Sequence, residues 1–322
     1  MVLTYVLFVA GFVLLIKSAD WLVEGSGSIA KRFGIPELVI GLTIVSFGTS
    51  MPELIVNVLA SISGSSELAI GNVFGSNISN ILLILGVSAV VRPLPIQRSI
   101  YFTEIPISLV ATFMVGFVAN AALFGEMGHE SISTADGVLL LLFFGLFMTY
   151  IYVVSRDKKE DFVGDAADME LMSMPKSLLL ILIGVTGLFF GGKWIVDGAI
   201  LIAQTVGLSE SFIGLTVVAI GTSLPELMTS VVAAYKGKAD MAIGNVIGSN
   251  IFNIFWILGL SAVIKALPFN PINNQDILML ILANTVLIFA VINGKKPSIS
   301  RFEGIVFVLI YLSYLLYLVF RG

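Results

Sequence analysis

The chain has 322 residues, of which 57% are hydrophobic and only 12% are charged. A soluble chain has about twice that charged fraction, so the composition excludes an ordinary soluble protein and indicates residence in the lipid bilayer. The formal net charge of −4 gives no reason to expect a nucleic-acid partner. The absence of cysteine excludes disulfides and thiolate metal sites, and the single histidine, His129, excludes a histidine-rich metal cage.

Apolar runs long enough to span a membrane recur along the whole chain. They predict ten transmembrane helices, at residues 2–29, 36–61, 67–91, 100–124, 136–154, 177–203, 210–234, 241–266, 276–293 and 303–320. The first run lacks a basic leader and a clear cleavage site, so we expect it to be a retained helix and not a signal peptide. Charged residues inside the first and sixth runs are expected to form local ion pairs: Lys17, Asp20, Glu24, Lys193 and Asp197.

Lysine and arginine are distributed unevenly over the loops between these runs. One face of the membrane receives only Lys265 and Arg321. The other receives thirteen basic residues: Lys31, Arg32, Arg92, Arg98, Arg156, Lys158, Lys159, Lys176, Lys236, Lys238, Lys295, Lys296 and Arg301. Because loops rich in lysine and arginine stay inside, the basic face is predicted to be cytoplasmic. We therefore expect a multi-pass protein of the cell membrane with both termini and His129 outside, and with the linker 155–176 in the cytoplasm.

The two halves of the chain repeat each other. Residues 48–86 and 221–259 align at a constant offset without a gap, and 23 of these 39 positions are identical. The likeness extends to motifs at 41–86 and 214–259 and divides the chain into a first repeat (1–154), a linker (155–176) and a second repeat (177–322). Each repeat holds five predicted helices, so the second enters the membrane from the opposite side. Inverted repeats with interrupted helices are typical of secondary transporters, whose site lies near the membrane midplane.

Each repeat places one glutamate in the middle of an apolar run, Glu53 in the first and Glu226 in the second. A charged side chain at the centre of a membrane helix costs about 2.5–3.5 kcal/mol on insertion scales, so this matched pair favours an ion path over a structural role. Two hydroxyl residues precede each glutamate at spacings that put all three side chains on one helical face: Thr49 and Ser50, and Thr222 and Ser223.

A proline also precedes each glutamate, Pro52 in the first repeat and Pro225 in the second. Proline removes a backbone N–H and crowds the carbonyl four residues earlier, so both helices are expected to break or kink there. The break should free the carbonyls around Ser46–Gly48 and Ala219–Gly221. Free carbonyls at this depth are tolerated only where they line a cavity or a site.

The third and eighth runs carry a second repeated motif, GNVFGSNISN and GNVIGSNIFN. Its glycines allow another helix to approach closely. The spacing i, i+4 makes Ser76 and Asn80 face one way in the first motif, and Ser249 and Asn253 in the second. The other asparagines are expected to satisfy the ends of broken helices in preference to binding ions: Asn72, Asn77, Asn245 and Asn250.

All the candidate donors are oxygens, which suit calcium, sodium or magnesium and argue against zinc and copper. Two carboxylates supply the charge that one divalent or two monovalent cations neutralise. The sequence therefore favours an exchange of calcium for sodium or protons, and magnesium fits less well because it keeps several waters. No nucleophile–base pair or cofactor motif is present, so we expect neither an enzyme nor a cofactor.

The motifs GTSMPEL with GNVFGSNISN, and GTSLPEL with GNVIGSNIFN, resemble the two α-repeats of the calcium/cation antiporter superfamily, and the prokaryotic sodium/calcium exchangers in particular. The resemblance covers essentially the whole chain. It implies a core of helices 2, 3, 7 and 8 around the ions, across which helices 1 and 6 slide to alternate access. It also implies the ligands Thr49, Ser50, Glu53, Ser76, Asn80, Thr222, Ser223, Glu226, Ser249 and Asn253, with the carbonyls of Ser46 and Ala219.

Two departures from the family pattern bear on the expected function. Asn253 stands where potassium-dependent exchangers have aspartate, which argues against potassium co-transport. The segment 155–176 is too short for the regulatory domains of animal exchangers and is expected to be a solvated linker, not a calcium sensor. We therefore expect a secondary active antiporter of calcium and sodium, surrounded by lipid and without an obligate protein partner. A proton/calcium antiporter on the same fold is the alternative, and a cation channel is a more remote one.

Overall fold

The computed structural model of the chain describes residues 2–121, 131–157, 171–205, 219–292 and 297–321. The elements of the N-terminal half are α1 (Val2–Phe33), α2 (Glu37–Ile40), η1 (Gly41–Val45), α3 (Ser46–Thr49), α4 (Met51–Ser63), α5 (Ser66–Ser79), η2 (Asn80–Ile84), α6 (Leu85–Val91), β1 (Leu94–Pro95), η3 (Ile100–Glu104), α7 (Ile105–Ala119), β2 (Ser131–Ile132) and α8 (Thr134–Asp157). Those of the C-terminal half are α9 (Met174–Thr205), α11 (Ala219–Thr222), α12 (Leu224–Tyr235), α13 (Ala239–Ile251), η6 (Phe252–Leu258), α14 (Gly259–Ile264), β3 (Leu267–Pro268), η7 (Pro271–Asn273), α15 (Asn274–Ile292), β4 (Ser298–Ile299) and α16 (Arg301–Arg321). The elements η1, η2, η3 and η6 are π-helical, and η7 is a 3₁₀ turn.

Most of the long helices are apolar enough to cross a membrane. Within the described ranges, eight helices meet this requirement, and the bent pair Glu37–Thr49 and Met51–Ser63 makes a ninth span. These helices confirm an all-α membrane protein. The run predicted at 210–234 and the linker at 155–176 are only partly described, and His129 and Lys158 lie outside the described residues. The count of ten helices therefore stays a prediction.

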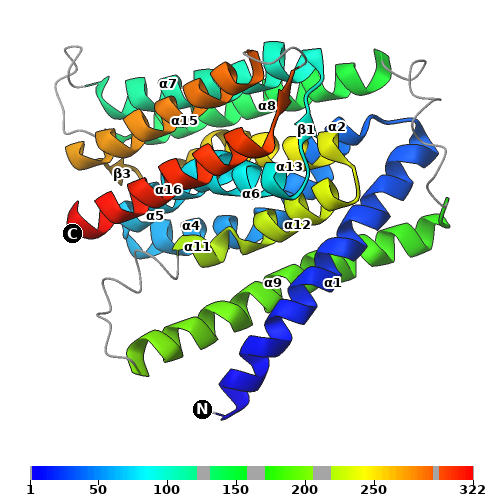
Figure 1. Cartoon of the computed structure of the whole chain (residues 1–322). Coiled ribbons are helices and arrows are strands. Elements are labelled where there is room, and N and C mark those ends of the chain that lie inside the picture. Colours follow the sequence, from blue (N-terminus) through cyan, green and yellow to red (C-terminus); the bar gives the residue numbers. More distant parts are fainter. Residues whose placement is uncertain (1, 122–130, 158–170, 206–218, 293–296, 322) are drawn as a thin grey trace.

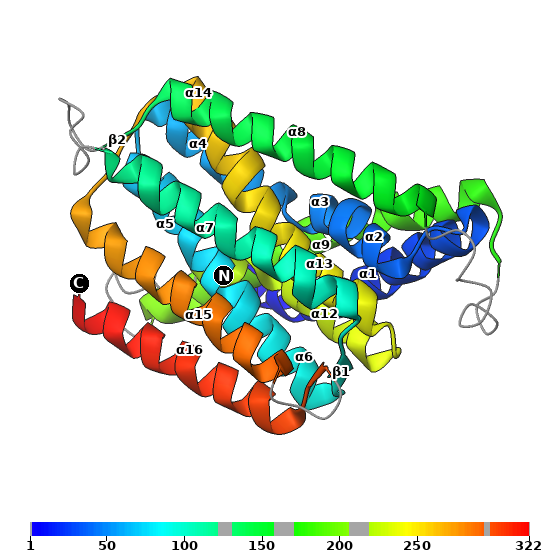
Figure 2. The ribbon, with the colours of Figure 1, turned by 90° about the horizontal axis from the view of Figure 1, so that it is seen from above.

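The helices form a buried core with other helices on both sides. In the apolar stretches of Ser66–Val91 and Ala239–Ile264, 78% of the residues are buried, against 22–44% in the other six of the eight long helices. The helices α7, α8 and α15 lie on one side of this core and the crossed pair α1 and α9 on the other (Figure 1). Seen from above, α7, α8, α15 and α16 run roughly parallel (Figure 2). The two most buried spans can therefore hold polar side chains away from lipid.

Two short antiparallel pairings join distant parts of the chain. In the first, Leu94 of β1 faces Ile299 of β4, and in the second, Ile132 of β2 faces Leu267 of β3. All four of these apolar side chains are buried. Each pairing therefore adds a small apolar contact between the N-terminal and the C-terminal half.

The helix that carries Glu53 is broken close to Pro52, as the sequence predicts. The break lies at Ser50, which has φ −84° and ψ 7°, and the segments on its two sides are bent by 49°. Ser223, two residues before Pro225, has nearly the same conformation, with φ −88° and ψ 4°. The expectation of a free carbonyl at Ser46 is wrong for this conformation. Because the break comes after the first turn of α3, the Ser46 oxygen still accepts the N–H of Ser50 at 3.0 Å.

The pair α1 and α9 packs closely through glycine. A methyl group added at Gly184 would lie 2.9 Å from the backbone nitrogen of Leu22 and 2.9 Å from the backbone oxygen of Ser18. A methyl group at Gly11, the equivalent position in the first repeat, would lie 3.0 Å from the backbone oxygen of Gly191. Small residues let two membrane helices approach this closely, so α1 and α9 form a tightly packed pair.

Gly184→Ala should destabilise the protein, because the added methyl group meets backbone atoms that cannot turn away. Overpacking of this kind costs about 1–3 kcal/mol, so we expect a lower unfolding temperature for the purified protein in detergent. Gly145→Ala in α8 is the matched control, since a methyl group there has no described atom within 4 Å. Equal unfolding temperatures for the two variants would contradict the close approach of α1 and α9.

Ion pairs follow the sequence-based expectation in α9 but not in α1. Lys193 Nζ lies 2.8 Å from Asp197 Oδ2 on the same helix, as expected. In α1, the expected partnership with Lys17 is wrong: Asp20 and Glu24 both pair with Lys236, whose Nζ lies 2.9 Å from Glu24 Oε1. Lys236 directly follows α12. A contact between elements that are distant in the sequence therefore replaces the local one and ties α1 to the core.

Candidate functional site

The two glutamates lie in the first turns of the helices that follow the breaks. Glu53 belongs to the first turn of α4 and Glu226 to the first turn of α12, and each is only 1% exposed. The N-terminus of a helix favours a negative charge, so each break lowers the free-energy cost of burying its carboxylate.

Hydroxyl groups connect the two halves of the chain around these carboxylates. Ser50 Oγ donates to Glu226 Oε1 at 2.9 Å and lies 3.0 Å from Ser249 Oγ. In the equivalent contact, Ser223 Oγ lies 3.3 Å from Ser76 Oγ. The serine at each break thus contacts a helix of the other half. The structure therefore brings these predicted ligands together, and neither half completes the site alone.

The two threonines contact asparagines that the sequence analysis assigned to helix ends. Thr49 Oγ1 donates to Asn245 Oδ1 at 3.1 Å, and Thr222 Oγ1 donates to Asn72 Oδ1 at 3.4 Å. Asn245 also donates to Ser230 Oγ at 2.9 Å. These bonds join side chains of different helices, so Asn245 does more than the sequence analysis expected. Its Nδ2 also lies 3.4 Å from the backbone oxygen of Glu226, in the first turn after the break. Sequence reasoning also missed Ser230.

Four further asparagines cross between the first and second halves of the chain. Asn80 Nδ2 donates to Asn250 Oδ1, and Asn253 Nδ2 donates to Asn77 Oδ1, both at 2.9 Å. Asn77 Nδ2 donates to the backbone oxygen of Asn250 at 3.2 Å, and Asn250 Nδ2 to that of Asn77 at 3.4 Å. These backbone oxygens lie in the last turns of α5 and α13, so Asn77 and Asn250 satisfy helix ends as expected, and they also join the two halves. Their one signal in the sequence is the triplet GSN, which occurs in both motifs.

Two of these asparagines lie at irregular turns of the core helices. The π-helical segment η2 begins at Asn80, and η6 begins at Phe252, one residue before Asn253. An extra residue in a helical turn rotates the following side chains, and such turns are frequent at functional sites. The same irregularity therefore marks the same place in both halves.

Among the predicted ligands, four buried oxygens have no hydrogen-bond donor in the described residues: Glu53 Oε2, Glu226 Oε2, Asn80 Oδ1 and Asn253 Oδ1. Unpaired buried acceptors are unfavourable, and most so when they carry charge. A cation between them would compensate the charge and satisfy the oxygens, and carboxylate and amide oxygens are ligands that hard cations use. Within the described residues no group of three acidic or histidine side chains gathers. The donor set therefore fits a hard cation held by two carboxylates and neutral oxygens.

The remaining predicted ligands lie in α3, α5, α11 and α13. Ser46 is buried in α3, where its Oγ donates to the backbone oxygen of Gly41 at 2.6 Å and lies 3.0 Å from that of Asn245. Ala219 is the first residue of α11. Thr222 is half-buried, whereas Thr49, Ser76 and Ser249 are fully buried. One candidate backbone carbonyl therefore lies one turn before each break, that of Ser46 before Ser50 and that of Ala219 before Ser223.

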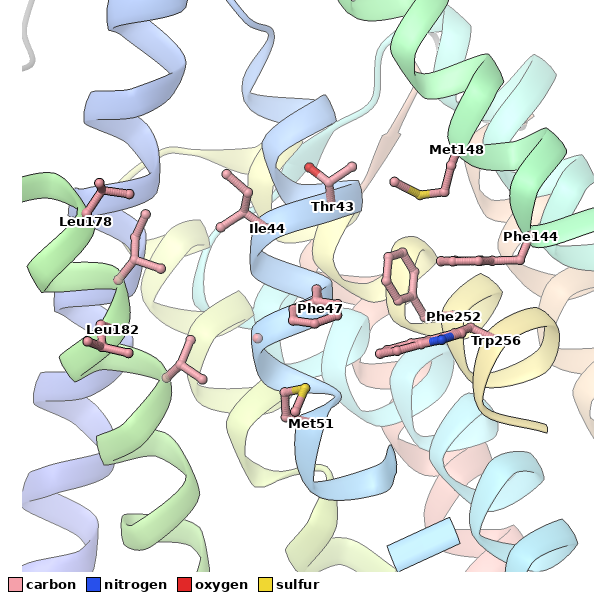
Figure 3. A pocket seen from close by; sticks show the side chains of 13 residues that line it. Thr43, Ile44, Phe47, Met51, Phe144, Met148, Leu178, Leu182, Phe252 and Trp256 are labelled. Atoms are coloured by element: carbon pink, nitrogen blue, oxygen red, sulfur yellow. The ribbon is translucent and has the colours of Figure 1, made fainter. Parts of the chain in front are cut away.

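An apolar pocket of about 690 Å³ lies beside the broken helix (Figure 3). Phe47, Met51 and Phe252 line it together with residues of α8 and α9. The rings of Phe47 and Trp256 stack there, with centroids 5.2 Å apart. Neither glutamate contributes to its wall, so this pocket is distinct from the oxygen-lined site.

Comparisons with known proteins give one consistent result. A family model described as sodium/calcium exchanger protein matches residues 3–153 and 176–320. The inner membrane protein YrbG of Escherichia coli is 36% identical over 313 residues, which cover 95% of this chain and 93% of the relative. The sodium/calcium exchanger MaX1 of Methanosarcina acetivorans is 31% identical over 351 residues, with 98% of both chains covered.

Solved structures extend this likeness to three dimensions. A structure of the sodium-calcium exchanger NCX_Mj, soaked with sodium and calcium, superimposes with a TM-score of 0.80 at 32% sequence identity. The superposition covers 97% of each chain. Both the sequence and the fold are therefore shared along nearly the full length.

Proposed function

Because this chain belongs to the sodium/calcium exchanger protein family, we propose that it exchanges calcium for sodium across the membrane by alternating access. As a member of this family it is an integral membrane cation/calcium antiporter. The observation that supports calcium and sodium as substrates is the pair of buried glutamates with unpaired oxygens in a donor set of oxygens alone. Calcium uptake driven by a sodium gradient tests the proposal.

The proposed architecture is two inverted five-helix repeats, 1–154 and 177–322, joined by a cytoplasmic linker at 155–176. Equivalent elements support it by where they begin. The helix α4 begins at Met51 and α12 at Leu224, and these two residues are aligned with each other in the repeat. The helix α5 begins at Ser66 and α13 at Ala239, which are aligned with each other in the same way.

The proposed ligands divide into a charged centre and neutral flanks. Glu53 and Glu226 hold calcium at the centre, and the hydroxyl and amide oxygens around them complete its shell or hold sodium: Thr49, Ser50, Ser76, Asn80, Thr222, Ser223, Ser249 and Asn253. The carbonyls of Ser46 and Ala219 serve the outlying sodium positions. The Ser46 oxygen already accepts the N–H of Ser50 and binds sodium through its second lone pair. The contacts of Ser50 with Ser249 and of Ser223 with Ser76 support flanks that each combine both halves.

The negative charge of the two glutamates explains why calcium transport in one direction is coupled to sodium transport in the other. An empty site would keep two uncompensated charges out of water during the conformational change, and burying unpaired charge is costly. Calcium or sodium removes this penalty, so the protein changes conformation only when it is loaded. In this proposal, the unit formed by α1 and α9 slides across the core and exposes the site to each side in turn.

Protons are the alternative driving ion, because both carboxylates can take up protons as well as metal ions. The neutral flanks favour sodium, since a pure proton carrier needs only the two glutamates. The two proposals differ in one measurable respect: only a sodium/calcium exchanger takes up calcium when sodium is the sole gradient.

Single cysteines can test the proposed orientation, because the chain has none of its own. Ser63 and Arg156 are both exposed and lie at the ends of α4 and α8. Since the basic loops are expected inside, a membrane-impermeant maleimide should label Ser63→Cys only from outside the cell. It should label Arg156→Cys only in inverted vesicles. Labelling from the reverse sides would show that the chain is inserted the other way round.

A further inference from the structure

An asparagine side chain can bind a cation through only one of its two ends. The amide oxygen attracts a cation, whereas the NH₂ group at the other end repels it. The two ends have nearly the same shape, so packing alone does not select between them. Asn80 and Asn253 can therefore serve as ligands only if other groups fix which end faces the glutamates.

The hydrogen bonds around Asn80 and Asn253 supply this selection. Each NH₂ group is held by an acceptor on the opposite half, Asn80 by Asn250 Oδ1 and Asn253 by Asn77 Oδ1, at 2.9 Å in both cases. The oxygens Asn80 Oδ1 and Asn253 Oδ1 are left without a donor among the described residues. All four side chains are buried, so water does not compete for these bonds.

The backbone determines the orientation of the two accepting asparagines. Asn250 Nδ2 donates to the backbone oxygen of Asn77, and Asn77 Nδ2 donates to the backbone oxygen of Asn250. A backbone carbonyl can only accept, so Asn77 and Asn250 must present their NH₂ groups to it. Their own oxygens then face Asn253 and Asn80, and turning either of those amides would set two acceptors 2.9 Å apart.

We propose that Asn77 and Asn250 are positioning residues that turn the amide oxygens of Asn80 and Asn253 toward the transported cation. The four side chains form a crossed clamp, in which each half of the chain orients the ligand of the other half. The nature of the cation rests on the proposed function, but the orientation of the amides does not. The clamp also joins η2 to α13 and η6 to α5, so it fixes the crossing of the core helices at the site.

A double-mutant cycle tests the clamp, with calcium binding to the purified protein in detergent measured by titration calorimetry. Asn250→Ala should weaken calcium binding about 10- to 100-fold, as is usual when the partner of a metal ligand is lost. Because Asn250 acts through Asn80, the variant that combines Asn250→Ala with Asn80→Ala should bind no more weakly than Asn80→Ala alone. Combining Asn250→Ala with Asn253→Ala should instead multiply the two single effects.

For Asn77 the roles of Asn80 and Asn253 are exchanged. Asn77→Ala should not weaken calcium binding further when Asn253→Ala is present. Its effect should multiply with that of Asn80→Ala, although Asn80 lies on the adjoining turn of the same helix. A merely structural asparagine would not show this crossed pattern. If Asn250→Ala unfolds, the cycle through Asn77 decides the proposal.

Asn284→Ala is the matched control for a lost buried amide. Asn284 is buried in α15, and its Nδ2 donates to the backbone oxygen of Leu280 on the same helix at 2.9 Å. Its calcium binding should equal that of the wild type. The clamp would be overturned if the losses of calcium affinity multiplied within the bonded pairs, Asn250 with Asn80 and Asn77 with Asn253. Calcium binding without sodium-driven uptake would overturn the proposed function and leave the clamp standing, and a wild type that binds no calcium would overturn both.

Discussion

Glu53→Gln and Glu226→Gln should each nearly abolish calcium uptake while the protein stays folded. Each substitution removes half of the charge at the site but keeps the size and hydrogen-bonding capacity of the side chain. Removing one partner of a buried pair of opposite charges, here a carboxylate that faces the calcium ion, costs about 3–5 kcal/mol. A difference of about 1.4 kcal/mol corresponds to a factor of ten. We therefore expect calcium uptake at subsaturating calcium to fall by at least about a hundredfold in either variant.

A buried glutamate outside the site provides the control for this experiment. Glu104 is 1% exposed, and its Oε1 accepts the hydroxyl of Tyr150 at 2.7 Å. An amide oxygen can accept the same bond, so Glu104→Gln should keep most of the uptake. Wild-type uptake by either Glu53→Gln or Glu226→Gln would show that the two carboxylates are not the centre of the site. An equal loss in Glu104→Gln would point to a general effect of neutralising a buried acid.

Much of the fold could be predicted because lipid allows few alternatives. The backbone of a spanning segment has to satisfy its own hydrogen bonds, so long apolar runs become helices. The runs predicted at 67–91 and 276–293 correspond to spans at Ser66–Val91 and Pro271–Ile292. The break near Pro52 could also be predicted, because proline acts on the turn that contains it. The exact position of the break, at Ser50, could not be predicted. The backbone geometry of the turn determines it, and not the N–H that Pro52 lacks.

The candidate site was predictable where its residues are neighbours in the sequence. Glu53 and Ser50 lie on adjacent turns, and the gapless alignment of the two repeats places Glu226 and Ser223 in the same relation. Helical spacing therefore predicted which side chains belong to the candidate site. It did not predict that Ser50 bonds Glu226 of the other half.

Contacts between the two halves were not predictable from the sequence. Asn77 bonds Asn253 rather than its neighbour Asn80, because the crossing of the core helices sets the distance between the amides. Asp20 pairs with Lys236 rather than Lys17 for the same kind of reason. Spacing along one helix shows which side chains share a face, but it does not show which other helix that face meets.

The identity of the driving ion distinguishes a sodium/calcium exchanger from a proton/calcium antiporter. Two carboxylates alone would serve calcium and protons equally well. The uncharged oxygens of Ser50, Ser249, Ser76 and Ser223 distinguish the site, because their contacts join both halves beside the carboxylates. Small neutral oxygens add ligands for sodium without adding charge.

The most direct measurement is the uptake of radiolabelled calcium by vesicles that contain the purified protein. The vesicles are loaded with sodium and diluted into sodium-free buffer at the same pH on both sides. We predict rapid calcium uptake that stops when sodium is present on both sides and that is inhibited by acidification, because protonated glutamates no longer bind calcium. Uptake driven by a pH gradient but not by a sodium gradient would contradict the account and identify a proton/calcium antiporter.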